Sequence, residues 1–210
     1  PSGSGKTYSL EKLSEMVNVP LITEDLTKFT SSGYIGRKIE EIGEDLITKA
    51  NGNHYLARFG IVFMDEFDKI ASSGISFGKD VNGLEVQNGL LKVVEGSDIQ
   101  LSKKYGNCFF STKYNLFIAG GAFENLKEQV EKKNEVKEKE HWSKYLTNES
   151  LREYGVERQV LGRFPIKVVY DELGEDALMQ IMNESKQSPL KCYIDEFYAW
   201  NIKLKFEDNA

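Results

Sequence analysis

The chain opens with the sequence PSGSGKT, residues 1–7, and this stretch decides the fold. It matches the last seven positions of the pattern G-x-x-x-x-G-K-[ST], so that only the first glycine of the pattern lies outside the sequence. In this pattern the glycines let successive backbone N–H groups point into one concavity, which holds phosphate oxygens. The sequence therefore predicts a phosphate-binding loop that leads directly into a helix.

The expected nucleotide-binding residues are the whole of this loop and the start of the helix: Pro1, Ser2, Gly3, Ser4, Gly5, Lys6, Thr7 and Tyr8. Lys6 is expected to place its charge on the β- and γ-phosphates, and the Thr7 hydroxyl is expected to ligate Mg²⁺. The helix that begins at Lys6 adds the partial positive charge of its N-terminus. The alternative interpretation is a Gly/Ser linker that happens to precede a helix.

A second motif, IVFMDE at residues 61–66, is an apolar strand that ends in two adjacent carboxylates. Asp65 is expected to hold the magnesium ion, and Glu66 to orient and deprotonate the water that attacks the γ-phosphate. An apolar run followed by Asp-Glu is common by itself. Together with the phosphate-binding loop it predicts a nucleoside-triphosphate site, in which Glu66, Asp65 and Lys6 are the catalytic candidates.

The composition excludes several other classes of protein. Among 210 residues there are 27 Lys and Arg against 33 Asp and Glu, a formal charge of −6, which disfavours nucleic acid as the main partner. The net charge does not exclude a local basic patch. Two distant cysteines (Cys108 and Cys192) and two histidines (His54 and His141) provide neither a disulfide scaffold nor a thiolate zinc site.

No apolar run approaches the roughly 18 residues that a transmembrane helix needs, and no signal peptide is visible. We therefore expect a cytoplasmic protein without a membrane partner.

Helical and strand patterns alternate along the chain. Apolar spacing predicts helices over roughly 6–18, over 39–50 and around 86–94, and strands over 20–22, 61–64, 116–119 and 166–170. Four consecutive apolar residues, as at 61–64 and 116–119, are typical of strands that are buried on both faces of a parallel sheet. The alternation predicts an α/β fold with a parallel sheet sandwiched by helices. A helical segment from about residue 172 is expected to start a separate, smaller domain.

Several motifs together resemble one family, in the family's order. They are GYIG (33–36), DEFDKI (65–70), VQNGLLK (86–92), FIAGGAF (117–123) and LGRFP (161–165). This combination is similar to the AAA+ ATPases of the ClpX and HslU kind, the Clp family of protein unfoldases. The resemblance implies a P-loop AAA+ large domain over 1–171, which begins within the phosphate-binding loop, and the first part of a small helical lid domain over 172–210.

The resemblance also implies further roles. Arg163 corresponds to the arginine finger, which serves the nucleotide of a neighbouring subunit in a ring. Gly33, Tyr34, Ile35 and Gly36 correspond to the pore loop, whose aromatic ring grips a translocating polypeptide. The implied cofactors are ATP and Mg²⁺, and the implied assembly is a homo-oligomer, a hexamer. Members that dock the ClpP peptidase carry an I-G-F-type loop, and residues 124–160 contain no such sequence. A peptidase partner such as ClpP is therefore left open.

The main hypothesis is a subunit of an ATP-dependent protein unfoldase and translocase of the ClpX type, which threads protein substrates. Two alternatives share the same nucleotide site. One is an ATP-dependent remodelling chaperone or scaffold without a peptidase, and the other is an AAA+ motor that acts on nucleic acid. Stimulation of the ATPase by unfolded protein, by DNA or by neither distinguishes the three.

Overall fold

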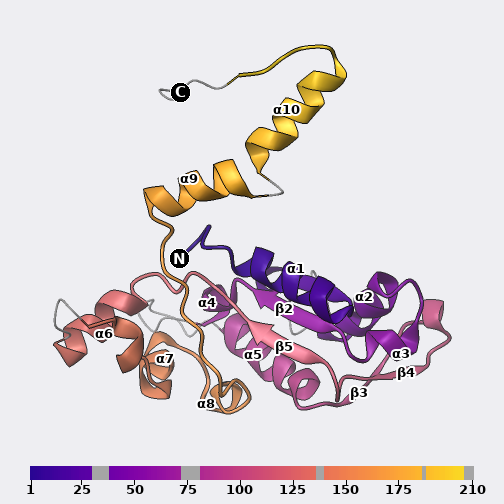
Figure 1. Ribbon diagram of the computed structural model, residues 1–210. Coiled ribbons are helices and arrows are strands. Elements are labelled where there is room, and N and C mark those ends of the chain that lie inside the picture. Colours follow the sequence, from indigo (N-terminus) through magenta and orange to yellow (C-terminus); the bar gives the residue numbers. More distant parts are fainter. Residues whose placement is uncertain (30–37, 72–80, 136–139, 186–187, 206–210) are drawn as a thin grey trace. The chain divides into compact units, whose positions relative to one another are not determined.

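The computed structural model describes residues 1–29, 38–71, 81–135, 140–185 and 188–205 (Figure 1). The chain divides into two compact units, Pro1–Tyr170 and Asp171–Ala210, and each is described by itself.

The first unit is built on a parallel sheet of three strands in the order β1 (Leu21–Asp25), β2 (Ile61–Asp65) and β5 (Leu116–Ala119). The central strand β2 is buried from Ile61 to Met64, each at most 2% exposed. The predicted strands at 61–64 and 116–119 and the parallel arrangement are thus confirmed. The predicted burial of the strand at 116–119 on both faces is wrong: Leu116 is 49% exposed and the other three residues of β5 are only partly buried, because β5 lies at the edge of the described sheet.

Helices precede and follow these strands. They are α1 (Lys6–Val17), α2 (Ile42–Lys49), α3 (His54–Ala57), α4 (Phe67–Ile70), α5 (Val81–Val94), α6 (Leu126–Asn134), α7 (Asn148–Tyr154) and α8 (Arg158–Leu161). Short 3-10 turns lie at Leu26–Lys28, Ile39–Glu41, Lys103–Tyr105 and Trp142–Tyr145, and β3 (Asp98–Gln100) pairs antiparallel with β4 (Phe109–Ser111). The three helices predicted in this unit are confirmed. The β3–β4 pair was not predicted.

The two faces of the sheet are covered by different helices (Figure 1). Ile61 and Phe63 of β2 pack in a cluster with Leu10 of α1. Val62 and Met64, which point to the other face because side chains alternate along a strand, belong to the larger core with residues of α2 and α5. Burial on both faces explains why the β2 sequence is continuously apolar. The predicted α/β fold with helices on both sides of the sheet is therefore confirmed.

The strand predicted at 166–170 is wrong. Within the described part of the chain these residues form no strand, and Ile166 (82%) and Val168 (74%) are largely exposed. The apolar and β-branched residues of this stretch favour an extended backbone. A strand also needs a neighbour that offers its N–H and C=O groups, and no described strand pairs with residues 166–170.

The second unit contains α9 (Glu175–Glu184) and α10 (Pro189–Ala199). Ser188 caps α10, since its side chain accepts a hydrogen bond from the Lys191 N–H, and Pro189 stands at the start of the helix, where its missing N–H has no cost. None of the helices in the described ranges has the length and apolar character that a membrane span requires. The assignment of this unit to a lid domain stays a prediction.

Candidate active site

A cavity of about 340 Å³ lies where the N-terminus of α1 meets the carboxyl ends of β2 and β5. Its lining residues are Ser2, Gly3, Ser4, Gly5, Lys6, Thr7, Tyr8, Asp65, Glu66, Gly121 and Ala122. Crevices at the carboxyl ends of parallel strands are the usual ligand sites of open α/β sheets. The structure therefore brings both sequence motifs, which lie about 60 residues apart, to one cavity.

The loop before α1 has the backbone that the glycines were expected to provide. Gly3 (φ 70°) and Gly5 (φ 84°) both adopt left-handed conformations, in which an L side chain would be strained. Gly5 is the N-cap of α1, and among the described residues no side chain caps this helix. The first N–H groups of α1 are thus available to an anion, as in phosphate-binding loops.

Lys6 is directed back into the loop. Its Nζ donates to the Pro1 carbonyl and lies 3.4 Å from Ser4 Oγ, which itself donates to the Pro1 carbonyl at 2.8 Å. Pro1 is not among the residues that line the cavity, in contrast to the other seven expected nucleotide-binding residues. Its carbonyl instead holds the loop and the lysine together.

Asp65 is the last residue of β2, and Glu66 follows it directly. The Glu66 N–H donates to Asp65 Oδ1 at 2.9 Å, which fixes the orientation of the Asp65 carboxylate. Glu66 itself is left-handed (φ 58°, ψ 30°), a conformation that costs a residue other than glycine about 1–2 kcal/mol. Strain of this kind persists where the surrounding structure holds the residue in place, and such positions concentrate at active sites.

Gly121 and Ala122, at the end of β5, complete the wall of the cavity, and the sequence did not mark them as site residues. The end of β5 is tied to β2 because the Gly120 N–H donates to the Met64 carbonyl at 2.8 Å. A Cβ on Gly121 would lie 2.1 Å from Asp68 Oδ1, so a side chain here would force the carboxylate or the backbone to shift. The glycine pair that closes an apolar strand next to the Asp-Glu strand is the signal that could have found this wall.

Behind this wall lies Asp68, which is 5% exposed. Its Oδ1 has no hydrogen-bond partner among the described residues, and its Oδ2 lies 3.6 Å from Lys69 Nζ. Burial raises the pKa of the Tyr154 hydroxyl above its ordinary value, and the charges of Asp68 and Glu124 raise this pKa further. The wall is thus backed by a buried acidic group.

One predicted catalytic residue, Arg163, lies elsewhere in the described part of the chain. Arg163 is not among the residues that line the cavity of its own chain, and its Nη2 pairs with Glu95 Oε1 at 2.5 Å on the surface. The predicted pore loop, residues 33–36, lies outside the described residues.

The residues of the cavity fit a nucleotide with a magnesium ion. The uncapped helix N-terminus and Lys6 provide the donors and the positive charge that phosphates require. The Thr7 hydroxyl and the Asp65 carboxylate are oxygen ligands of the kind that Mg²⁺ prefers, and Mg²⁺ beside a nucleotide is typically held by one or two protein side chains together with the phosphates.

The family model for the AAA domain (Cdc48 subfamily) matches residues 1–167. The chain therefore belongs to the AAA ATPase family, and this membership implies that it binds ATP.

Among curated proteins, the chain is similar to "ATP-dependent Clp protease ATP-binding subunit ClpX" of Bacteroides thetaiotaomicron. The two are 34% identical over 231 residues, which cover 100% of this chain and 56% of the relative. ClpX 2 of Wolinella succinogenes is 34% identical over 222 residues (100% and 56%), and ClpX of Borrelia duttonii is 35% identical over 231 residues (100% and 54%). The chain thus spans about half the length of the curated relatives it matches, and it is ClpX-like.

Proposed function

We propose that this chain provides the ATPase of a protein unfoldase and translocase of the ClpX type. Two observations support the proposal. The phosphate-binding loop and the Asp65-Glu66 pair line one cavity, and the chain resembles ClpX subunits along its whole length. In this proposal residues 1–171 are the large ATPase domain, and residues 172–210 begin the lid domain.

In the proposed reaction the N–H groups of the loop and Lys6 hold the phosphates of ATP. Thr7 and Asp65 hold Mg²⁺, which would neutralise charge that develops on the phosphate oxygens. Glu66 accepts a proton from the water whose oxygen bonds to the γ-phosphorus, while the bond from that phosphorus to the bridging oxygen breaks and ADP leaves. Because the Asp65 carboxylate already accepts the Glu66 N–H, this carboxylate is fixed relative to the Glu66 backbone before substrate binds.

Arg163 acts in this proposal on the nucleotide of a neighbouring copy. Its position supports this role, because Arg163 lies outside its own cavity and its side chain is half exposed. An arginine that contributes charge to a second site requires a neighbouring copy beside that site, and we propose that the copies form a hexameric ring. An isolated copy is then expected to hydrolyse ATP slowly, since an arginine finger accelerates phosphoryl transfer about 10³-fold or more.

The proposed substrate is an unfolded or tagged polypeptide, gripped by Tyr34 between Gly33 and Gly36. The relatives are named as ATP-binding subunits of a Clp protease, so a ClpP-type peptidase is the proposed partner. Because residues 124–160 contain no I-G-F sequence, we also propose that the peptidase docks through another surface. The cytoplasmic location stays a prediction.

The test uses the full-length protein and a tagged, stable fluorescent protein as substrate. ATP is expected to abolish the fluorescence, Glu66→Gln to bind ATP without turnover, and Tyr34→Ala to hydrolyse ATP without unfolding. Tyr34→Phe keeps the ring and serves as the matched control, which should retain unfolding. Hydrolysis that unfolds no tagged substrate would instead support the remodelling scaffold, and stimulation by DNA would support the nucleic-acid motor.

A further inference from the structure

A buried glutamine on α5 joins this helix to two other segments of the first unit, the end of α4 and the turn before α8. Gln87 is 1% exposed. Its Nε2 donates to the Ile70 carbonyl at 2.9 Å and to the Gly155 carbonyl at 3.3 Å, and its Oε1 accepts from the Glu157 N–H at 2.9 Å. Both amide donors and the amide oxygen are therefore used, as a buried polar side chain requires.

These partners belong to functional segments. Ile70 ends α4, the helix that begins directly after Glu66. Glu157 is the N-cap of α8, and Arg163 follows two residues after that helix ends at Leu161. One side chain thus connects the segment behind the proposed catalytic base with the segment that carries the proposed arginine finger.

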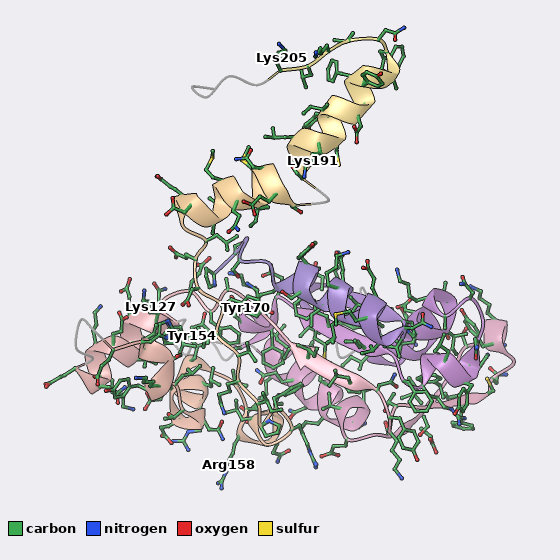
Figure 2. The ribbon with its side chains drawn as sticks, in the orientation of Figure 1. Lys127, Tyr154, Arg158, Tyr170, Lys191 and Lys205 are labelled. Carbon is green, nitrogen blue, oxygen red and sulfur yellow. The ribbon has the colours of Figure 1, made fainter. Side chains whose placement is uncertain are left out.

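The same helix also holds the other end of the α8 segment. Glu95 directly follows α5 and pairs with Arg163 at 2.5 Å. Between these two anchors Val160 (2% exposed) and Leu161 (7%) are buried in the core. Arg158, in contrast, is exposed and projects away from the unit (Figure 2). α5 therefore determines where residues 157–163 lie.

The two anchors differ in strength. The Glu95–Arg163 pair is about half exposed on both sides, and exposed ion pairs contribute little because water and salt screen them. Gln87 is buried, and its loss would leave two carbonyl groups and one N–H group without their partner, which is costly in a protein interior. Gln87 is thus the stronger constraint on the α8 segment.

We propose that Gln87 is a positioning residue for Arg163, which holds the α8 segment so that the guanidinium reaches the nucleotide of the neighbouring copy. The inference rests on the proposed function, in which Arg163 acts across a subunit boundary. It assigns to Gln87 an effect on the neighbour's turnover, an effect that a general contribution to stability would not produce.

The test uses the full-length protein and mixes two kinds of copies. Donor copies carry Glu66→Gln, so that they keep Arg163 but do not hydrolyse their own ATP. Acceptor copies carry Arg163→Ala, so that they keep their own site but offer no finger. In the mixture, fast turnover requires a donor Arg163 beside an acceptor nucleotide. Gln87→Met, which keeps the size of the side chain and removes its hydrogen bonds, is then placed in the donor or in the acceptor.

Turnover at saturating ATP is expected to fall about tenfold or more with Gln87→Met in the donor and to change less than about twofold in the acceptor, since a displaced catalytic group readily costs one to two orders of magnitude. A loss in the donor no larger than the loss in the acceptor overturns the inference. Absence of turnover in the unsubstituted mixture, while unmixed wild-type protein hydrolyses ATP, is a different result, because it overturns the proposed action of Arg163 in trans.

A second variant decides the matter if Gln87→Met disrupts folding in both arms. Gln87→Glu keeps the shape, and its protonated form can still donate to Ile70 and accept from Glu157. Its ionised form would face two carbonyl oxygens. Burial raises the pKa of such a carboxyl group, so donor turnover relative to the unsubstituted donor is expected to recover as the pH is lowered. A pH profile identical to that of the unsubstituted donor overturns the inference.

Discussion

The ring of Phe67 lies 6.4 Å from the ring of Phe164, centroid to centroid, with the two planes inclined by 63°. Phe67 directly follows Glu66, and Phe164 directly follows Arg163. Edge-to-face contacts of this kind contribute about 0.5–1.5 kcal/mol beyond the burial of the rings. The residues next to the proposed base and the proposed finger thus touch each other within one chain.

This contact predicts coupling between the two rings. Phe164→Leu and Phe67→Leu are each expected to lower the free energy of unfolding by about 1–3 kcal/mol, and the double variant by about 0.5–1.5 kcal/mol less than the sum. Denaturant unfolding of the single and double variants measures this coupling. Phe59→Leu, at a ring that is 40% exposed, is the control and should cost less. Strict additivity of the Phe67 and Phe164 variants would contradict the prediction.

The close approach of Gly121 to Asp68 predicts that the cavity wall tolerates no side chain. In Gly121→Ala the new Cβ would lie 2.1 Å from Asp68 Oδ1, so either the carboxylate or the wall must move. We expect ATP to bind about tenfold more weakly and the free energy of unfolding to fall by about 1–3 kcal/mol. Titration with a fluorescent ATP analogue measures the affinity.

Gly174→Ala is the matched control for this substitution, because nothing lies within 4 Å of its added Cβ. It should leave the affinity close to that of the parent and lower the free energy of unfolding by no more than about 1 kcal/mol, since Gly174 is the N-cap of α9. Unchanged affinity in Gly121→Ala would show that the wall can shift without reaching the nucleotide.

The sequence predicted those parts of the site whose geometry is local. Gly5, Lys6 and Thr7 are adjacent in the chain and share one turn of backbone. Asp65 ends one strand and Glu66 follows it directly, so each motif carries its own arrangement. Gly121 joins the site only because β5 lies beside β2, a pairing between segments more than 50 residues apart. A local sequence pattern predicts the strand, but it does not predict which other strand pairs with it.

The same distinction explains the wrong strand at 166–170. Its apolar and β-branched residues fit an extended backbone, as do the four consecutive apolar residues at 61–64, but only the latter have paired strands on both sides. Gln87 is the converse case, a structural contact for which the sequence carries no signal. A single glutamine in a helix gives no signal of a buried bridge, because its three partners at Ile70, Gly155 and Glu157 come from distant segments.

The environment of Tyr154 predicts how stability depends on pH. Burial is the main cause of its raised pKa, so the folded state keeps the hydroxyl proton at a pH where the unfolded chain, with a tyrosine pKa of about 10, loses it. The free energy of unfolding should therefore be fully retained below about pH 10 and fall as the pH rises through the raised pKa. In Tyr154→Phe this part of the loss should disappear, and denaturant unfolding between about pH 9 and pH 11 measures it.

Tyr55→Phe, at a side chain that is 72% exposed, is the control for that experiment and should lose stability with pH as the parent does. Equal pH dependence in Tyr154→Phe and in the parent would contradict the assignment.

The Glu95–Arg163 pair predicts a ranking of the two anchors on α5. Since both side chains are about half exposed, Glu95→Gln should change the free energy of unfolding by less than about 1 kcal/mol. In the donor copies of the mixing experiment it should lower turnover only about two- to threefold, and this difference from the parent should shrink as salt is raised toward about 1 M, where the Debye length is about 3 Å. The loss in Gln87→Met should persist at the same salt concentration, because its cause is buried. A loss in Glu95→Gln as large as that in Gln87→Met, and equally insensitive to salt, would reverse the ranking and make the surface ion pair the main constraint on Arg163.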